Sequence, residues 1–360
     1  MKAPIELDPR AASGPTCFLS CDGTMNESTP LHARDTAALV AGYKAMVQAR
    51  MFDEKAIALQ RTGRLGTYAS CLGQEAVGVG VAQLMQESDV FLPSFREHAA
   101  QLCRGVTLLE LFLYWGGDER GSDFAVARRD FPVSIPVASH LLHAVGVALA
   151  FKLRGEPNVA VAVAGDGATS KGDFYEAINM AGVWNVPAVF VINNNQWAIS
   201  VPREEQTAAD TLAQKAVAAG LPGEQVDGND LVAVREAMDR AMSRARAGEG
   251  ASVLECVTYR LGDHTTADDA SRYRDPDQVS LHWQDEPISR LRAYLMHQRA
   301  WSKEEERNLI ETCRQQIETS SEAYLAAEAQ DISEIFTNQF EELPDELRRQ
   351  KASLIQLEGT

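Results

Sequence analysis

Three short apolar segments limit the possible folds of this chain more than any other feature. They cover residues 159–164, 188–192 and 253–259 and consist largely of β-branched or small residues. Strands with one solvent-exposed face alternate apolar and polar residues, whereas strands buried on both faces do not. The segments therefore predict central, parallel strands. A helical stretch at 174–184 joins the first two, which predicts a right-handed β-α-β unit in an α/β fold: a mostly parallel central sheet flanked by helices.

Composition divides the chain into three predicted parts. Residues 1–34 are rich in Pro, Gly and Ser without periodicity and predict an N-terminal arm. Residues 35–300 are expected to form the ligand-binding domain. Residues 301–360 predict an acidic helical C-terminal extension, because 14 Asp and Glu face 6 Lys and Arg there. Apolar spacing predicts helices at residues 35–62, 73–85, 108–115, 141–153 and 302–330. Asp35 with Thr36 is the expected cap of the first, and the last is expected to begin with a capping box at Ser302.

Charge and cysteine content narrow the classes of partner and compartment. A formal net charge of −17 repels phosphate backbones and anionic lipids, so neither nucleic acid nor membrane is an expected partner. No apolar run approaches the roughly 18 residues of a membrane span, and no secretory leader follows Met1, so a cytoplasmic protein is expected. The six cysteines form no CxxC pair and are expected to be reduced thiols.

The turn after the first apolar segment is the strongest indication of a ligand site. Gly165, Gly167 and Ala168 let backbone N–H groups approach a diphosphate, while Asp166 would repel it unless a divalent cation lay between them. The run 193–195, three asparagines, ends the next strand and offers neutral oxygen ligands. Alone, a glycine-flanked aspartate is equally compatible with a tight turn. Neither GxxxxGK[ST] nor GxGxxG is present, so ATP and NAD are not indicated.

Together these residues resemble the thiamin-diphosphate motif shared by transketolases, pyruvate decarboxylases and 2-oxo acid dehydrogenases. That motif is GDG followed after about 30 residues by NN, and Gly165 to Asn195 spans 30 positions here. The resemblance implies that Asp166 and Asn195 bind Mg²⁺ by their side chains and Trp197 by its backbone carbonyl. It also implies that Gly165, Gly167 and Ala168 lie at the diphosphate.

Most of the chain resembles the alpha chains of the decarboxylase component of 2-oxo acid dehydrogenase complexes, above all the bacterial pyruvate-specific type. The similarity is carried by residues 63–76, 173–200, 211–230 and 259–274. It implies a thiamin-diphosphate-binding fold, a beta-chain partner in a heterotetramer of two alpha and two beta chains, and a lipoyl acyltransferase core. The implied reaction is the oxidative decarboxylation of pyruvate with reductive acetylation of lipoyl groups.

Two further segments have counterparts in that family. Arg96 matches the arginine that pairs with the diphosphate, and Phe95 stands where many relatives have Tyr. Ile135 and Val137 match residues that support the bent cofactor. From the residues alone, Arg96 could also form a surface ion pair, and Ile135 with Val137 could form a plain hydrophobic turn.

The polar loop 260–274 supplies the candidate catalytic residues. By resemblance, His264 lies over the active site with Arg260 near it, and an imidazole titrating near neutrality would suit diphosphate binding or proton transfer. A solvated loop histidine is the alternative. Thr265 and Thr266 stand where mitochondrial relatives carry a regulatory phosphoserine, although nothing here indicates a kinase. The roles of His98, His140 and His143 stay open.

The acyl substrate is the main open point at this stage. A branched-chain 2-oxo acid dehydrogenase, acting on 3-methyl-2-oxobutanoate, is the first alternative to a pyruvate enzyme, and an acetoin dehydrogenase is the second. A non-catalytic scaffold subunit is the alternative from another class. It predicts erosion of the metal ligands, whereas Asp166 and Asn195 are both present.

Overall fold

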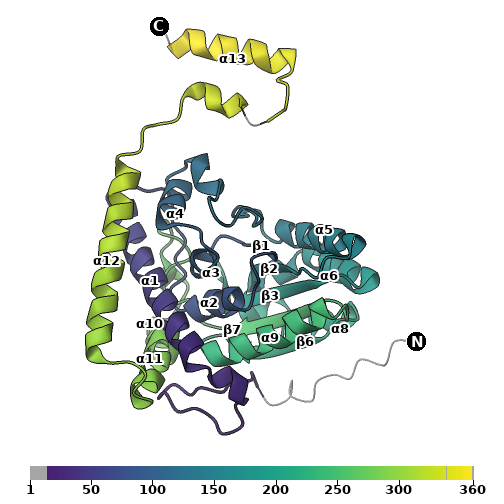
Figure 1. The fold of residues 1–360 in the computed structure, drawn as a ribbon, viewed down its shortest axis with the longest axis vertical. Coiled ribbons are helices and arrows are strands. Elements are labelled where there is room, and N and C mark those ends of the chain that lie inside the picture. Colours follow the sequence, from purple (N-terminus) through teal and green to yellow (C-terminus); the bar gives the residue numbers. More distant parts are fainter. Residues whose placement is uncertain (1–13, 338, 359–360) are drawn as a thin grey trace.

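The computed structural model describes residues 14–337 and 339–358. Its secondary structure alternates helices with short strands through most of its length (Figure 1). The helices are α1 (Thr36–Arg61), α2 (Glu75–Gln83), α3 (His98–Cys103), α4 (Leu108–Trp115), α5 (Ser139–Arg154), α6 (Gly172–Trp184), α7 (Arg203–Gln206), α8 (Lys215–Ala218), α9 (Leu231–Arg246), α10 (Pro276–His282), α11 (Pro287–His297), α12 (Lys303–Leu325) and α13 (Asp345–Glu358). The strands are β1 (Val90–Leu92), β2 (Ala160–Gly165), β3 (Ala188–Asn194), β4 (Trp197–Ala198), β5 (Val201–Pro202), β6 (Gly223–Asp227) and β7 (Ser252–Val257).

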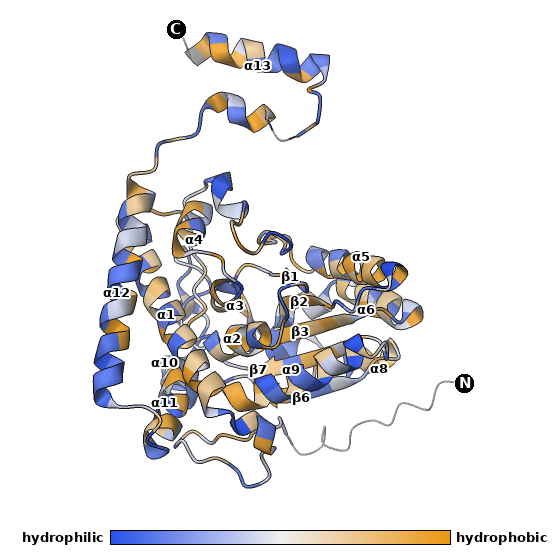
Figure 2. Cartoon of the chain, in the orientation of Figure 1, coloured by the Kyte–Doolittle hydropathy of each residue, from blue (hydrophilic) through white to orange (hydrophobic). Residues whose placement is uncertain are grey.

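The central sheet is parallel throughout and has the order β1-β2-β3-β7-β6. Every residue of β3 is buried, as the unbroken apolar pattern predicts. Helices cover both faces: the side chains of α5 and α6 pack on one side, and those of α2 and α9 on the other. Figure 2 shows the hydrophobic β3 enclosed between these layers. The predicted α/β class, with its mostly parallel sheet flanked by helices, is confirmed.

Register places the ends of two neighbouring strands side by side. Gly165, the last residue of β2, pairs with Asn193 near the end of β3. The chain continues from Gly165 into a short 3-10 helix, Asp166–Ser170, and from Asn193 into two further asparagines. The residues that follow both strands therefore meet at the carboxyl edge of the sheet, where ligands of parallel α/β folds bind.

Local capping explains why several helices begin where they do. Asp35 accepts hydrogen bonds from the first backbone amides of α1, as the sequence predicts. Ser302 and Glu305 form the predicted capping box of α12, and Thr107 with Glu110 forms another at α4. These side chains satisfy amides that have no partner within the helix.

The structure departs from the expected elements at short or polar segments. Strands β1 and β6 lack a distinctive pattern, since one has three residues and the other reads GEQVD, and neither is predicted from the sequence. The acidic helix predicted for 302–330 ends at Leu325, because residues 325–331 are all exposed and offer no buried face to extend it. Predicted and observed ends of the other helices differ by at most two residues.

The two terminal segments differ in how they meet the domain. Near the N-terminus, Thr16 bridges to Val226 of β6, and the amides of Phe18 and Leu19 donate to buried Asp230. Near the C-terminus, α13 extends beyond the body of the domain, as Figure 1 shows. The division of the chain at 34 and 300 stays a prediction, and residues 1–13 of the arm lie outside the described residues. None of the described helices combines the length and hydropathy needed to cross a bilayer.

Candidate functional site

A cavity of about 660 Å³ opens at the carboxyl ends of β2 and β3. Its walls come from loops that are far apart in the sequence and that contain nearly every predicted site residue. The lining residues used below are Ala69, Gln74, Phe95, Arg96, Trp115, Ile135, Val137, His140, Gly165, Asp166, Gly167, Ala168, Asn195, Trp197, Ile199 and His264. The fold thus brings the glycine-rich turn, the asparagine cluster, the Arg96 segment and the His264 loop to one cavity.

Asp166 lies at the bottom of this cavity with 1% of its surface exposed. Burial raises the pKa of its carboxyl group, opposed by a hydrogen bond of 2.5 Å that the Gln206 amide donates to Oδ2. On the adjacent strand end, Asn195 donates to the side-chain oxygen of Gln74 at 3.1 Å. Its own side-chain oxygen accepts from the amide of Trp197 at 3.2 Å. A buried carboxylate and an amide oxygen therefore stand at neighbouring strand ends.

Backbone conformation around the cavity is unusual. Ala138, Gln196 and Ile199 have φ values of 70°, 71° and 55°, in the left-handed region that L side chains rarely adopt. They flank the site: Ala138 and Ile199 line it, and Gln196 lies between Asn195 and Trp197. Such strain often accompanies functional sites and persists only where the surrounding structure supports it.

Gly167 shows why a residue without a side chain is needed in the turn. A Cβ atom added there would lie 2.8 Å from the Cβ of Ala198, closer than real Cβ contacts. Ala198 belongs to the β4–β5 hairpin, which folds back beside the turn. The glycine therefore lets the hairpin and its Trp197 pack directly against the residues that follow Asp166.

Two buried arginines contribute positive charge to the cavity: Arg96 lines it, whereas Arg260 lies outside the lining and bonds to the lining residues Trp197 and His264. Arg96 is 6% exposed and Arg260 is 1% exposed, and no described carboxylate lies within salt-bridge distance of either. Burial and the nearby Arg260 lower the pKa of Arg96 to about 10, and burial also lowers the pKa of Arg260. Both guanidinium groups bond to neutral acceptors instead, including the backbone oxygen of Ser70 for Arg96 and that of Trp197 for Arg260. Neither charge has a direct carboxylate partner among the described residues, which favours an anionic ligand.

His264 lies between these two arginines. Its Nδ1 atom is 3.2 Å from a nitrogen of Arg96 and 3.4 Å from one of Arg260. Guanidinium nitrogens only donate, so Nδ1 is the acceptor and the proton of the neutral ring is on Nε2. Burial, Arg96 and Arg260 lower the pKa of His264 to about 4. The expectation of titration near neutrality is therefore wrong for the chain alone, because two cations disfavour the imidazolium.

The remaining predicted residues lie at the cavity as well. Phe95 contacts His264 edge-on, with ring centroids 6.0 Å apart, and the Arg96 guanidinium lies over the Phe95 ring. Ile135 and Val137 line the cavity yet are 53% and 43% exposed. This chain therefore leaves a wide apolar opening at that side. The individual roles of all these residues stay predictions.

Sequence reasoning missed two amides that support the predicted ligands. Gln74 bonds Asn195, and Gln206 bonds Asp166. Gln74 belongs to the GQEA run that carries the family resemblance, which is the one signal that could have identified it. Gln206 has no such signal, because only the tertiary fold brings α7 beside the turn.

The structure places the three histidines whose roles the sequence left open in different surroundings. His140 lines the cavity, and its Nε2 donates to the backbone oxygen of Val163 at 2.8 Å. His98 is fully buried behind the cavity wall and donates to the oxygen of Ala69. His143 is exposed and packs against Phe131. All six cysteines are free thiols, as expected.

Comparisons with known proteins agree with this geometry. Residues 43–335 match the family described as dehydrogenase E1 component. The chain is 40% identical to the 3-methyl-2-oxobutanoate dehydrogenase subunit alpha of Mycobacterium tuberculosis, over 97% of this chain and 94% of that protein. It is also 40% identical to the pyruvate dehydrogenase E1 component subunit alpha of Staphylococcus aureus, over 87% of this chain and 85% of that protein.

The chain therefore belongs to the dehydrogenase E1 component family. Within that family it is of the alpha-subunit type, a part of a thiamin-diphosphate-dependent oxidoreductase that acts on 2-oxo acids. The two relatives act on different 2-oxo acids according to their names, and both are equally identical to this chain.

Proposed function

We propose that this chain binds Mg²⁺ and the diphosphate of thiamin diphosphate and, with a beta chain, catalyses the oxidative decarboxylation of pyruvate. The observation that carries the proposal is the meeting of Asp166 and Asn195 at adjacent ends of parallel strands, in one cavity with Arg96. The scaffold alternative predicts loss of these ligands and is disfavoured by their arrangement.

The donor set at the strand ends suits a hard divalent cation. Asp166 offers a carboxylate, Asn195 an amide oxygen and Trp197 a backbone carbonyl, all oxygen atoms of the kind that Mg²⁺ prefers. The described residues contain no group of three or more His, Cys, Asp or Glu side chains that could hold a metal ion, so a cation beside Asp166 would depend on amide and carbonyl oxygens as further ligands. A cation beside Asp166 would also offset the cost of burying its charge.

The arginines suit the diphosphate in the same way. Arg96, a buried guanidinium group of the cavity wall without a carboxylate partner, would gain strong charge-assisted hydrogen bonds from an anion, and the nearby Arg260 would add positive charge. Thiamin diphosphate supplies a thiazolium carbon that attacks the 2-oxo carbonyl and a ring that accepts the electrons released with CO₂. The chain contributes electrostatics and orientation. His264 offers an Nε2–H donor toward the cavity, and Arg96 and Arg260 hold its ring through Nδ1.

A beta chain is proposed because the site is open on one side. Ile135, Val137 and Ile199 line the cavity yet are 53%, 43% and 55% exposed, so a second chain is needed to enclose the reacting groups. We propose the family arrangement of two alpha and two beta chains working with a lipoyl acyltransferase core. The alpha chain alone is then expected to be inactive.

Pyruvate is proposed as the substrate because the cavity wall is bulky. Phe95 and Trp115 belong to the lining, and their large aromatic rings favour a small acyl group. A branched-chain substrate is the second candidate, supported by the relative from Mycobacterium tuberculosis that covers 97% of this chain.

Steady-state assays of the reconstituted alpha-beta enzyme would decide between these substrates. The value of kcat/KM should be at least about tenfold higher for pyruvate than for 3-methyl-2-oxobutanoate, because the latter carries two additional methyl groups and one extra methylene in a hydrophobic pocket already changes kcat/KM about tenfold or more. Acetoin serves as a third substrate. The reverse preference would replace pyruvate with a branched-chain acid, and activity without added Mg²⁺ in chelator-treated enzyme would contradict the metal proposal.

A further inference from the structure

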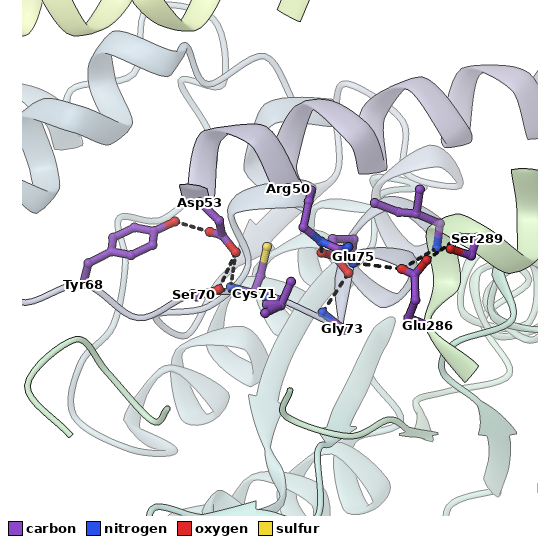
Figure 3. A network of polar contacts seen from close by, with 11 residues as sticks. Arg50, Asp53, Tyr68, Ser70, Cys71, Gly73, Glu75, Glu286 and Ser289 are labelled. Atoms are coloured by element: carbon purple, nitrogen blue, oxygen red, sulfur yellow. Dashed lines mark hydrogen bonds and ion pairs between the residues drawn. The ribbon is translucent and has the colours of Figure 1, made fainter. Parts of the chain in front are cut away.

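The loop that leads into α2, residues 65–74, separates α1 from the cavity, and we call it the wall loop. Thr67 and Ala69 of this loop line the cavity. The residues between and after them, Tyr68 and Ser70, point the opposite way, toward Asp53 of α1 (Figure 3). One face of the wall loop therefore serves the site and the other is attached to a helix.

Asp53 is the attachment point. Its side chain is 2% exposed and accepts three hydrogen bonds from the wall loop. The donors are the Tyr68 hydroxyl, the Ser70 hydroxyl at 2.6 Å and the Cys71 amide at 2.8 Å. No described cation pairs with this carboxylate, so these three donors are what compensates its burial.

A second network attaches the far end of the same loop. Arg50, three residues before Asp53 on α1, forms ion pairs with Glu75 and with Glu286 at the start of α11. Glu75 in turn accepts from the amide of Gly73 at 3.0 Å. Figure 3 shows both networks side by side along α1. The helix thus holds the wall loop at two points.

On its other side the wall loop is joined to the loop that carries His264. The amide of Tyr68 donates to the hydroxyl of Thr266 at 3.0 Å, and the amide of Thr266 donates to the carbonyl of Tyr68 at 2.9 Å. The carbonyl of Ser70 accepts from Arg96 at 2.6 Å, and Arg96 also bonds the carbonyl of His264 at 2.9 Å. Tyr68 is therefore bound to α1 by its side chain and to the His264 loop by its backbone.

We propose that Asp53 and Tyr68 are positioning residues. The side-chain hydrogen bond between them fixes the wall loop, and the bonds between Tyr68 and Thr266 attach the 260–274 loop to it. This attachment, which we call the clasp, holds His264 beside Arg96. Neither side chain lines the cavity. The effect of the clasp on the reaction rests on the proposed function of His264. The contacts that form the clasp do not depend on that function.

The chain contains a matched control for this contact. Tyr43 is also on α1 and fully buried, and its hydroxyl bonds the carboxylate of Glu306 at 2.9 and 2.8 Å. That contact joins α1 to α12 and has no link to the cavity. Tyr43→Phe and Tyr68→Phe therefore remove the same kind of hydrogen bond, and only the second should reach the His264 loop.

Hydrogen exchange of the full-length chain would test the clasp directly. Tyr68→Phe should speed exchange in peptides spanning 260–274 about tenfold, comparable to the loss of one hydrogen bond to a charged group. Tyr43→Phe should leave those peptides unchanged although it weakens global stability to a similar degree. Equal exchange of 260–274 in the two variants would overturn the proposal.

Asp53 allows a rescue test that a purely structural role would not pass. In Asp53→Asn the amide oxygen can still accept from Ser70 and Cys71, and the NH₂ can donate to the Tyr68 hydroxyl, so loop protection should persist. Asp53→Leu should lose it. Loss of protection in Asp53→Asn with unchanged urea stability would contradict this assignment of bonds, and should Asp53→Leu fail to fold, Tyr68→Phe still decides.

Cofactor titration of the reconstituted alpha-beta enzyme separates the two proposals. With Mg²⁺ and thiamin diphosphate, Tyr68→Phe should raise the cofactor concentration needed for half-maximal activity severalfold, while Tyr43→Phe should not. Faster loop exchange with unchanged cofactor affinity would support the clasp and contradict the proposed role of His264. Unchanged exchange would overturn the clasp whatever the affinity.

Discussion

The two sides of the cavity are built in different ways. The strand-end corner, formed by Asp166 and Asn195, follows directly from β2 and β3, whose backbone register brings both residues together. The loop side, formed by Arg96, Arg260 and His264, depends on side-chain hydrogen bonds between loops far apart in the sequence. Backbone pairing in a buried sheet is cooperative and rigid, whereas loop contacts open locally at lower cost. Removing a charge at the strand-end corner should therefore lower only the affinity for the ligand. Changes on the loop side should lower the affinity for the ligand and also loosen the loops themselves.

The largest effect is expected from Asp166→Ala. Loss of the buried carboxylate should lower the affinity for Mg²⁺ and thiamin diphosphate at least about 100-fold, measured by calorimetry on the alpha-beta assembly, because a direct ligand is removed. Asp173→Ala is the matched control, since this half-exposed carboxylate lies in the same segment and pairs only with Lys171. An unchanged cofactor affinity in Asp166→Ala would contradict the metal assignment.

A smaller loss is expected on the loop side from Arg96→Met. The diphosphate would lose charge-assisted hydrogen bonds, so its affinity should fall about 10- to 100-fold and depend less steeply on salt. Arg96→Lys keeps the charge and loses the forked geometry, so its affinity for the diphosphate should lie between those of the parent protein and Arg96→Met. NMR should also show a higher pKa for His264 in Arg96→Met, because Arg96 is one cause of its lowering. Equal affinity in all three proteins would remove Arg96 from the site.

Acid should lower the unfolding free energy of the protein, because His98 is buried as a neutral ring behind the wall loop. Burial lowers the pKa of this histidine to about 4. In the unfolded chain the ring binds a proton near pH 6.5. Its contribution to stability is therefore complete above pH 6.5 and is lost as the pH falls toward 4, by about 2 kcal/mol between pH 7 and pH 5. Urea unfolding at both pH values should show this loss in the parent protein and in the exposed-site control His143→Gln. His98→Phe should lack the part of this pH-dependent loss of unfolding free energy that comes from His98. An identical pH dependence in His98→Phe and the parent protein would refute the prediction.

The smallest effect is expected far from both sides of the cavity, at Ser302→Ala. Removing the side chain of this capping box should cost about 1 kcal/mol of unfolding free energy, because an amide at the start of α12 loses its partner. Cofactor affinity should not change, as measured by calorimetry alongside thermal unfolding. A loss of affinity would show that α12 supports the site, which the comparison of the two sides does not predict.

Sequence patterns were sufficient where local chemistry decides the outcome. The apolar runs of β2, β3 and β7 and the caps at Asp35 and Ser302 are all found near their expected positions. The glycine-flanked Asp166 and the asparagines at the end of β3 marked the strand-end corner, because chain order and parallel pairing imply that they meet. The short strands β1 and β6 were missed because three to five residues carry too little pattern.

The loop side was harder to predict, since its properties arise from neighbours in space. His264 was expected to titrate near neutrality, and burial together with the proximity of two arginines lowers its pKa instead. Gln206 could not be anticipated beside Asp166, because nothing near α7 in the sequence marks a site. The same is true of the contact between Tyr68 and Asp53, which joins residues 15 positions apart through a buried side chain.

By itself, the sequence determined the parallel α/β architecture, the membership in a thiamin-dependent family and the residues that meet at the strand ends, because hydrophobic pattern and parallel pairing follow from residue order. Only the tertiary structure decided how Arg96 and Arg260 are placed around His264, which amides support Asp166 and Asn195, and how α1 holds the wall loop. These features depend on burial and on distances between remote segments, and both determine the pKa of a group and the partner of each hydrogen bond.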